Sequence, residues 1–118
     1  WARNRWGLST CPRKYLARGT PKTWNHKPVN EMHNFIQAPI CMGKERTKHK
    51  TQKPLKVCLP FIEISSNEGD VVLDPFIGSG STAVAAKMLK RNFIGYELNA
   101  EFCEIANQRI ENTQTQSR

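Results

Sequence analysis

The chain has 118 residues, of which 38% are hydrophobic, and its formal net charge is +8. This length and apolar content allow one folding unit with a modest core. No apolar run approaches the roughly 20 residues that a membrane-spanning helix needs, so we expect no membrane insertion.

The first part of the chain, residues 1–48, is basic, punctuated by proline and weakly periodic. The first 53 residues carry 12 Lys and Arg against two acids, whereas the remainder carries six against eight. Aromatic residues stand among the cations: Trp1, Trp6, Tyr15 and Trp24. Cations neutralise phosphates and aromatic rings stack on bases, which favours a nucleic acid partner. A solvated face and small-core aromatic anchors are the alternatives. Residues 35–40 predict a short strand, which Pro39 would place at a sheet edge.

Four cysteines stand far apart and form no CxxC pair: Cys11, Cys41, Cys58 and Cys103. In a chain without a secretory apolar segment, this usage favours a reducing compartment and free thiols. A zinc site is the alternative, and its ligands would be Cys11, His26, His33 and Cys41. Their intervals lack the tight two-ligand knuckles of convincing zinc sites, so we predict no metal site.

The pattern changes at TQKPLKVCLPFIEIS, residues 51–65, where apolar side chains recur at helical spacing. Pro54 suits the first helical position, because its missing N–H is not needed there. One helical face would carry Leu55, Cys58, Leu59 and Ile62. Pro60 lacks a donor and crowds the preceding turn, so we expect it to kink or restart the helix.

An alternation of strands and helices follows. NEGD, residues 67–70, predicts a turn, and VVLDPF after it predicts a buried β-branched strand that ends at Pro75. STAVAAKMLK, residues 81–90, predicts a helix capped by Ser81 or Thr82. That helix would face the sheet through Val84, Ala85, Met88 and Leu89.

NFIGYE, residues 92–97, predicts a second strand, and residues 99–110 predict a helix capped by Asn99. This last helix would pack through Phe102, Ile105, Ala106 and Ile110. Strands separated by one helix are parallel neighbours joined by a right-handed crossover. The second half of the chain therefore predicts half of a doubly wound α/β sheet.

A glycine-rich loop, residues 78–82, joins the first strand to its helix. Together with Ala83 it fits G-x-G-x-x-A, which by itself is a weak indication of a nucleotide site. Glycine permits a tight turn and a close approach of a ligand to the main chain, and the following helix adds N–H donors.

Each predicted strand also ends in an acid, Asp74 or Glu97, at the edge where such sheets bind ligands. Glu97 lies 19 residues after Gly78 and could accept both hydroxyls of an adenosine ribose. Asp74 would repel a pyrophosphate, so a cationic adenosyl ligand, S-adenosylmethionine (SAM), fits better than NAD. A P-loop is excluded, because no Gly-Lys-Ser/Thr follows. In the alternative interpretation, Asp74 only ends the strand and caps a helix, and Glu97 is a surface charge.

Three ordered blocks carry a family resemblance: HKTQKP (49–54), EGDVVLDPFIGSGSTAVAA (68–86) and RNFIGYELNAEFCEIANQRI (91–110). Over about residues 45–110 the chain resembles the C-terminal part of the DNA methyltransferases that make N6-methyladenine or N4-methylcytosine. Lys50 stands where the family usually has a proline after the histidine. The block order is similar to the beta arrangement, in which the catalytic block and target-recognition region come first.

The resemblance implies a partial Rossmann-like methyltransferase fold, a parallel sheet with flanking helices, preceded by an irregular basic segment. It divides the chain into the remainder of a target-recognition region (1–48), a SAM-binding half-domain (49–112) and a polar tail (113–118). The family's catalytic block, an Asp, Asn or Ser before Pro-Pro and an aromatic residue, is expected before Trp1. No Pro-Pro pair occurs in the 118 residues.

The resemblance also implies which residues contact SAM. Asp74 would meet the ammonium side of the methionine, Phe76 would pack at the cofactor and Glu97 would hold the ribose. The loop would supply backbone and hydroxyl contacts from Gly78, Ser79, Gly80, Ser81 and Thr82. Thr51, Gln52 and Lys53 would close over the methionine end, with Lys53 charged for its carboxylate. It implies no catalytic residue in this chain.

The implied reaction is in-line transfer of the sulfonium methyl to the amino nitrogen of a flipped-out base. Orientation of the two reacting groups would be the main contribution to catalysis. The implied partners are double-stranded DNA and, as a second candidate, a separate chain that carries the catalytic block. We expect a cytoplasmic protein of a prokaryote or phage. Two other functions stay open: a non-catalytic nucleic-acid-binding module derived from such an enzyme, and a fragment of an NAD-dependent oxidoreductase.

Overall fold

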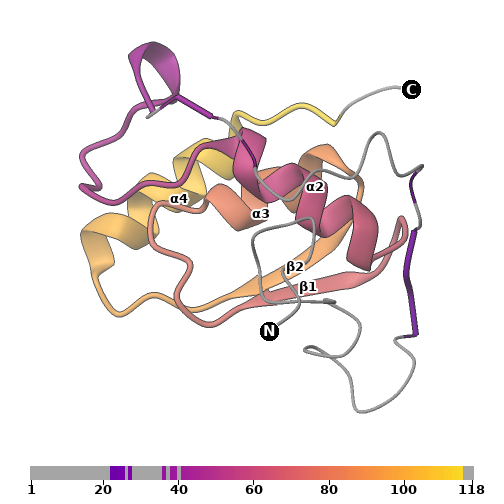
Figure 1. The fold of residues 1–118 in the computed structure, drawn as a ribbon. Helices are drawn as coiled ribbons and strands as arrows, with labels where there is room; N and C mark the ends of the chain where they lie inside the picture. Colours follow the sequence, from indigo (N-terminus) through magenta and orange to yellow (C-terminus); the bar gives the residue numbers. More distant parts are fainter. Residues whose placement is uncertain (1–21, 26, 28–35, 37, 40, 116–118) are drawn as a thin grey trace, which may run out of the picture.

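A computed structural model describes residues 22–25, 27, 36, 38–39 and 41–115. The elements of this part follow one another as 3-10 helix η1 (Gly43–Glu45), helix α2 (Leu55–Ser65), strand β1 (Val71–Asp74), helix α3 (Ser81–Met88), strand β2 (Asn92–Gly95) and helix α4 (Ala100–Glu111). The α-helices lie together on one side of the strands, and α3 packs against both strands as well as against α2 and α4 (Figure 1). This is the partial Rossmann-like arrangement that the sequence predicts.

The two strands of the described sheet pair in parallel, with Val71 opposite Asn92 and Asp74 opposite Gly95. β1 ends one residue before Pro75, as predicted, because proline cannot donate to the ladder. The predicted turn before it is also confirmed, since the Asp70 N–H donates to the Asn67 carbonyl over 3.1 Å. Because both strands run in the same direction, their carboxyl ends meet at one edge of the sheet.

The core lies between the sheet and the helices. Its buried centre consists of Ile62 from α2 with Ala85 and Ala86 from α3. Partly buried side chains pack around that centre: Leu55, Cys58, Leu59, Val72, Leu89 and Phe93. The alanines of α3 have no exposed surface, and their small side chains let α2 and the sheet approach this helix closely. The predicted apolar face of α2 is thereby confirmed.

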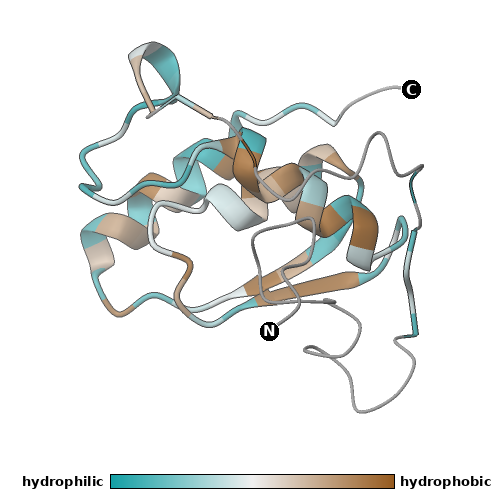
Figure 2. Cartoon of the chain, in the orientation of Figure 1, coloured by the Kyte–Doolittle hydropathy of each residue, from teal (hydrophilic) through white to brown (hydrophobic). Residues whose placement is uncertain are grey.

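The opposite face of the sheet is open, which corrects the prediction that the first strand is buried. Val71, Leu73 and Ile94 are 58%, 63% and 48% exposed. Successive side chains of a strand point to opposite faces, and the described helices cover one face only. Val72 and Phe93 therefore enter the core while their neighbours do not. Both strands are apolar in their middle, while Asp74 ends β1 and Asn92 begins β2 (Figure 2).

Two local predictions need correction. α2 runs through Pro60 as one helix, so of the two outcomes expected there, a kink or a restart, the restart does not occur. α3 is not capped by a hydroxyl: Gly80 occupies the cap position with φ 81°, and Ser81 begins the helix. The Ser81 hydroxyl instead donates to the Lys53 carbonyl over 2.8 Å. In α4, by contrast, the predicted cap is confirmed, since the Asn99 side chain accepts from the N–H groups of Glu101 and Phe102.

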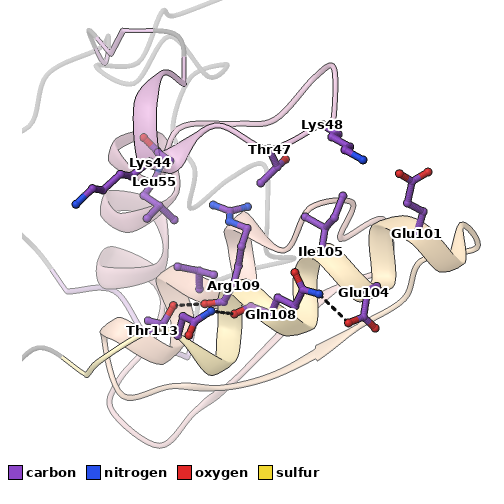
Figure 3. Close-up of a pocket in the computed structure, with 13 residues that line it drawn as sticks. Lys44, Thr47, Lys48, Leu55, Glu101, Glu104, Ile105, Gln108, Arg109 and Thr113 are labelled. Atoms are coloured by element: carbon purple, nitrogen blue, oxygen red, sulfur yellow. Dashed lines mark hydrogen bonds between the residues drawn. The ribbon is translucent and has the colours of Figure 1, made fainter.

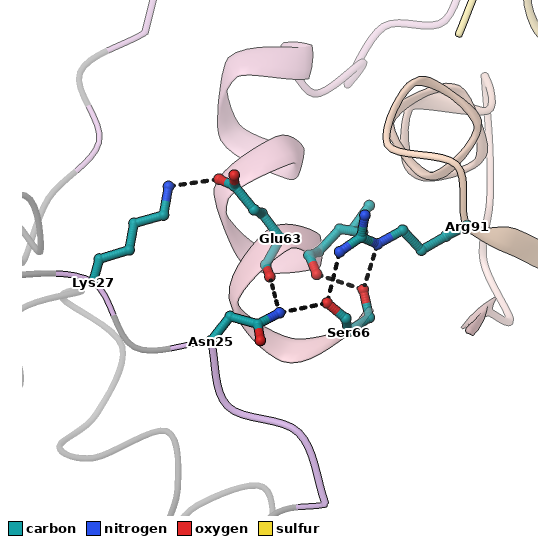
Figure 4. Close-up of polar contacts among 6 residues, drawn as sticks. Asn25, Lys27, Glu63, Ser66 and Arg91 are labelled. Atoms are coloured by element: carbon teal, nitrogen blue, oxygen red, sulfur yellow. Dashed lines mark hydrogen bonds and ion pairs between the residues drawn. The ribbon is translucent and has the colours of Figure 1, made fainter. Parts of the chain in front are cut away.

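Two residues of the basic segment, Asn25 and Lys27, bind the C-terminal end of α2 (Figure 4). The Asn25 side-chain amide donates to the carbonyls of Glu63 and Ser66, and the Lys27 ammonium lies 2.6 Å from the Glu63 carboxylate. Arg91 reaches the same place from the start of β2, donating to the Ser66 hydroxyl over 3.1 Å and carbonyl over 2.7 Å. Residues on three segments thus meet at Ser66.

Other predictions for the basic segment lie wholly or partly outside the described residues. Trp1, Trp6 and Tyr15 are among these, while Trp24 is described and half-buried. Of the strand predicted at residues 35–40, the structure describes Ile36, Ala38 and Pro39, and these three belong to no strand. No helix among the described residues is both long enough and apolar enough to cross a membrane.

Candidate functional site

A cavity of about 490 Å³ opens at the carboxyl ends of the two strands. It brings together all the cofactor contacts predicted from the sequence except Gly80: Thr51, Gln52, Lys53, Asp74, Phe76, Gly78, Ser79, Ser81, Thr82 and Glu97. His49, Cys58 and Ile77 complete the lining. The residues come from the segment before α2 (residues 44–53), which we call the arm, from α2 itself, from the end of β1, from the glycine-rich loop and from the chain after β2. We call this cavity the strand-end cavity.

Glu97 ties the end of β2 to the glycine-rich loop. Its Oε2 accepts from the Gly78 N–H over 3.0 Å, and its Oε1 accepts from the Asn99 N–H over 2.9 Å. A carboxylate offers about four lone pairs, so each oxygen keeps one for a further donor. The side chain is therefore oriented before any ligand arrives and can still accept hydrogen bonds from ligand hydroxyls.

Asp74 lies at the end of the neighbouring strand. Its Oδ1 accepts from the Phe76 N–H over 3.0 Å, and its backbone carbonyl accepts from the Tyr96 N–H over 3.1 Å. Oδ2 has no hydrogen-bond partner among the described residues. Phe76 is 88% exposed at the same cavity, so its ring is available to a ligand. The two acids thus place negative charge on one cavity from adjacent strand ends.

The arm that carries TQKP is shaped by Gln52, which is only 8% exposed. Its Oε1 accepts from the Thr47 N–H over 2.9 Å and from the Thr47 hydroxyl over 2.6 Å, while its Nε2 donates to the Glu45 carbonyl. The amide is thus engaged within the arm. The arm is joined to α3 by the bond from the Ser81 hydroxyl to the Lys53 carbonyl.

His49 lines the cavity although it was not among the predicted contacts. A Cβ on Gly78 would lie 3.0 Å from its Nε2, so the loop passes close to the imidazole only because residue 78 is glycine. Its ring meets Phe102 edge-on, with centroids 4.4 Å apart, and its buried Nδ1 has no hydrogen-bond partner in the part of the chain that the structure describes. The sequence signal was present, since His49 begins the HKTQKP block.

Gly80 is the predicted contact that the structure places elsewhere. It does not line the cavity. Instead it packs against α4, where an added Cβ would lie 2.9 Å from the Cβ of Ala106. Its φ of 81° is also in the left-handed region that favours glycine. In this structure the second glycine of the loop therefore serves helix packing.

Cys58 is the thiol of the cavity, and burial raises its pKa; the charge of Lys53 opposes this change and that of Asp74 adds to it. Alkylation proceeds through the thiolate, so a raised pKa slows it at a given pH. We expect iodoacetamide to modify Cys58 more slowly in the folded chain than in urea at about pH 7.5, and the difference to shrink above about pH 9. Peptide-resolved mass spectrometry measures this. Equal rates in the folded and unfolded chain at neutral pH would contradict it.

A second and larger cavity, of about 790 Å³, lies between residues 44–48 and α4 (Figure 3). Its lining mixes cations such as Lys44 and Lys48 with acids such as Glu101 and Glu104. This mixture indicates no particular ligand, and the cavity lies away from the strand ends. Size alone therefore does not make it the functional site.

The alternative zinc site falls largely on residues that the structure does not describe. Cys11, His26 and His33 lie outside the described residues. Within the part that is described, no group of three His, Cys, Asp or Glu side chains could hold a metal ion. Cys41 is buried, and its thiol donates to the Gln52 carbonyl over 3.6 Å.

A glycine-rich loop between a parallel strand and a helix, with acids at two strand ends, defines a nucleoside-binding unit of the Rossmann-like class. The particular family follows from comparison of the sequences. Residues 4–108 match the N6_N4_Mtase family, described as DNA methylase, and the chain therefore belongs to this family.

Individual relatives agree with this assignment. The type II methyltransferase M.HpaI of Haemophilus parainfluenzae is 46% identical over 85% of the chain, and M.HinfI of Haemophilus influenzae is 38% identical over 75% of it. The chain spans 31% and 28% of the lengths of these relatives. Among solved structures, a complex of M1.HpyAVI with SAM matches with a TM-score of 0.66 and 44% identity. That match covers 75% of this chain and 43% of M1.HpyAVI.

Proposed function

We propose that this chain is the SAM-binding and DNA-contacting part of a DNA methyltransferase of a restriction-modification system. The reaction is transfer of a methyl group to the exocyclic amino nitrogen of adenine (N6) or cytosine (N4). The observation that carries the proposal is the strand-end cavity, where Asp74 and Glu97 face the same space as the glycine-rich loop. The match to M1.HpyAVI, which was crystallised with SAM, supports the same ligand.

The residues of the cavity fit SAM in charge and in hydrogen-bonding capacity. Glu97 is held by two backbone N–H groups and keeps lone pairs for the ribose hydroxyls. The free oxygen of Asp74 suits the ammonium of the methionine moiety, and Lys53 suits its carboxylate. Phe76 offers an exposed ring for packing. When bound, SAM supplies a methyl group made electrophilic by its sulfonium centre.

DNA contact is supported by exposed cations beside the site. The arm before α2 carries Lys44, Arg46, Lys48, Lys50 and Lys53, all exposed, against the single acid Glu45. Such cations neutralise phosphates, which positions the DNA without reading its sequence. Double-stranded DNA is the proposed substrate, because base flipping would deliver the reacting amine from a duplex.

We further propose that the catalytic block lies outside these 118 residues, in a preceding segment or in a separate chain. The absence of a Pro-Pro pair supports this, and so does the open apolar face of β1 and β2. Exposed apolar side chains on a sheet are commonly covered by a further layer of a domain. Co-expression with a polypeptide that carries such a block, followed by a methyl-transfer assay, tests the point. No transfer from a stable complex of the two would contradict it.

Calorimetric titration of the 118-residue chain tests the cofactor. We expect SAM to bind and NADH to bind at least about tenfold more weakly, because Asp74 repels a diphosphate. Circular dichroism first establishes that the chain is folded. No heat of SAM binding from a folded chain would contradict the proposal, and tighter binding of NADH would favour the oxidoreductase alternative.

A non-catalytic nucleic-acid-binding module is the second candidate, and the exposed cations of residues 44–53 are the observation that favours it. This candidate predicts DNA binding that weakens steeply with salt and does not depend on SAM. Titration of labelled duplex DNA at two salt concentrations, with and without SAM, distinguishes it from the enzyme fragment.

A further inference from the structure

Arg109, in the last turn of α4, donates from a single nitrogen into the glycine-rich loop. Its Nη1 lies 2.5 Å from the Ser79 carbonyl oxygen, 3.1 Å from the Ser79 hydroxyl and 3.2 Å from the Ser81 hydroxyl. This nitrogen has two hydrogens, so the three acceptors share them. Both serines line the strand-end cavity. α4 thus makes a direct polar contact with the backbone and side chains of the loop.

The contact continues to the arm before α2. The Ser81 hydroxyl accepts from Arg109 and donates its own hydrogen to the Lys53 carbonyl. Arginine has donors only, so it settles which way this hydroxyl can point. Arg109, Ser81 and Lys53 therefore form a chain of hydrogen bonds that joins α4, the start of α3 and the arm. The loop and the arm that it joins line the same cavity.

Close packing of α4 on the loop makes this reach possible. Gly80 meets Ala106, and Arg109 follows Ala106 by three residues on the same face of the helix. Arg109 also lines the second cavity, into which its side chain rises from α4 between Leu55 and Thr47 (Figure 3). The side chain therefore stands in the wall between the two cavities.

The charge of Arg109 suits this place. The guanidinium is half-buried, which lowers its pKa, while the nearby charge of Glu45 opposes that change. Arginine remains protonated throughout the neutral range even so. Hydrogen bonds from a charged donor are about twice as strong as neutral ones, so this contact resists opening of the loop.

From this arrangement we propose that Arg109 is a positioning residue for the methyltransferase site. It holds the Gly78–Ser81 loop and the arm in the geometry that accepts the cofactor, without touching the cofactor itself. This inference rests on the proposed function for its consequence, which is tighter SAM binding, but the ordering of the loop can be measured without any ligand.

The experiment uses the 118-residue chain with Arg109→Met, which keeps an unbranched side chain and removes every donor, and Arg109→Lys, which restores a charged donor. Amide hydrogen exchange of residues 78–81 is measured without ligand, and SAM affinity by calorimetry. We expect Arg109→Met to exchange these amides about tenfold faster and to bind SAM about tenfold more weakly. Arg109→Lys should recover part of both changes.

Arg91→Met is the matched control, because Arg91 also donates to three acceptors and is the more deeply buried of the two arginines, at the C-terminal end of α2. Arg91→Met should lower the overall stability of the chain. Once the rates are corrected for that loss, amide exchange in the loop should stay within about twofold of wild type, and so should the SAM affinity of the folded chain. Loop exchange in Arg109→Met no faster than in Arg91→Met would overturn the inference. If Arg109→Met speeds loop exchange as expected but the wild-type chain binds no SAM, the proposed function is contradicted and the positioning role of Arg109 is not.

Discussion

Replacing Glu97 by alanine is expected to weaken SAM binding by about 100-fold, measured by calorimetry. The variant loses the acceptors proposed for the ribose and also the bond that holds the Gly78 N–H. A hydrogen bond to a charged group contributes about 1.5–3 kcal/mol, so loss of two accounts for this factor. The SAM affinity of Glu97→Gln should lie between those of wild type and Glu97→Ala, because the amide oxygen can still accept a hydrogen bond although the charge is gone.

Glu68→Ala provides the matched control for Glu97. It removes a carboxylate of the same type from an exposed turn, where Glu68 lies 3.8 Å from the Lys90 ammonium. Exposed ion pairs contribute little, so both stability and SAM affinity should stay close to wild type. A folded Glu97→Ala chain that binds SAM as tightly as Glu68→Ala would show that Glu97 is not a cofactor contact.

Gly80→Ala is the substitution for which we expect the largest loss of stability. The added Cβ would lie 2.9 Å from the Cβ and 3.0 Å from the Cα of Ala106, and the second of these atoms is backbone. The left-handed φ adds about 1–2 kcal/mol of strain for any residue with a Cβ. Together with overpacking, we expect the free energy of unfolding to fall by about 3 kcal/mol or more, as measured by urea denaturation.

Gly69→Ala separates the two contributions. Gly69 has almost the same conformation, with φ 85°, but nothing lies within 4 Å of an added Cβ. Its alanine variant should therefore lose only the backbone contribution, about 1–2 kcal/mol. If the two variants lose equal stability, the approach of α4 to the loop at Ala106 is looser than the structure shows, and the reach of Arg109 would need another explanation.

Local sequence patterns predicted the elements because those elements depend on neighbours in the chain. A run of apolar β-branched residues predicted β1, and the Asn99 side chain predicted the start of α4, where it accepts two hydrogen bonds. The parallel order followed from one helix between two strands. That order is also why the sequence alone predicts Asp74 and Glu97 at a shared edge of the sheet. The family resemblance added Thr51, Gln52 and Lys53 of the arm to the residues expected at this edge.

What local patterns could not show is which contacts form between distant segments. Whether Val71 and Leu73 are buried depends on whether a second layer covers the outer face of the sheet. The sequence of the strand is the same in either case. Ser81 looks like a helix cap, yet its hydroxyl meets the Lys53 carbonyl, 28 positions earlier in the chain.

The sequence by itself thus determined the order of strands and helices, the acids at the strand ends and the family. Only the tertiary structure decided that Gly80 serves packing against Ala106, that His49 borders the cavity and that Arg109 reaches Ser79 from 30 positions away. The physical reason is that a propensity or a cap depends on a few adjacent residues. A close approach depends on how whole helices settle against one another.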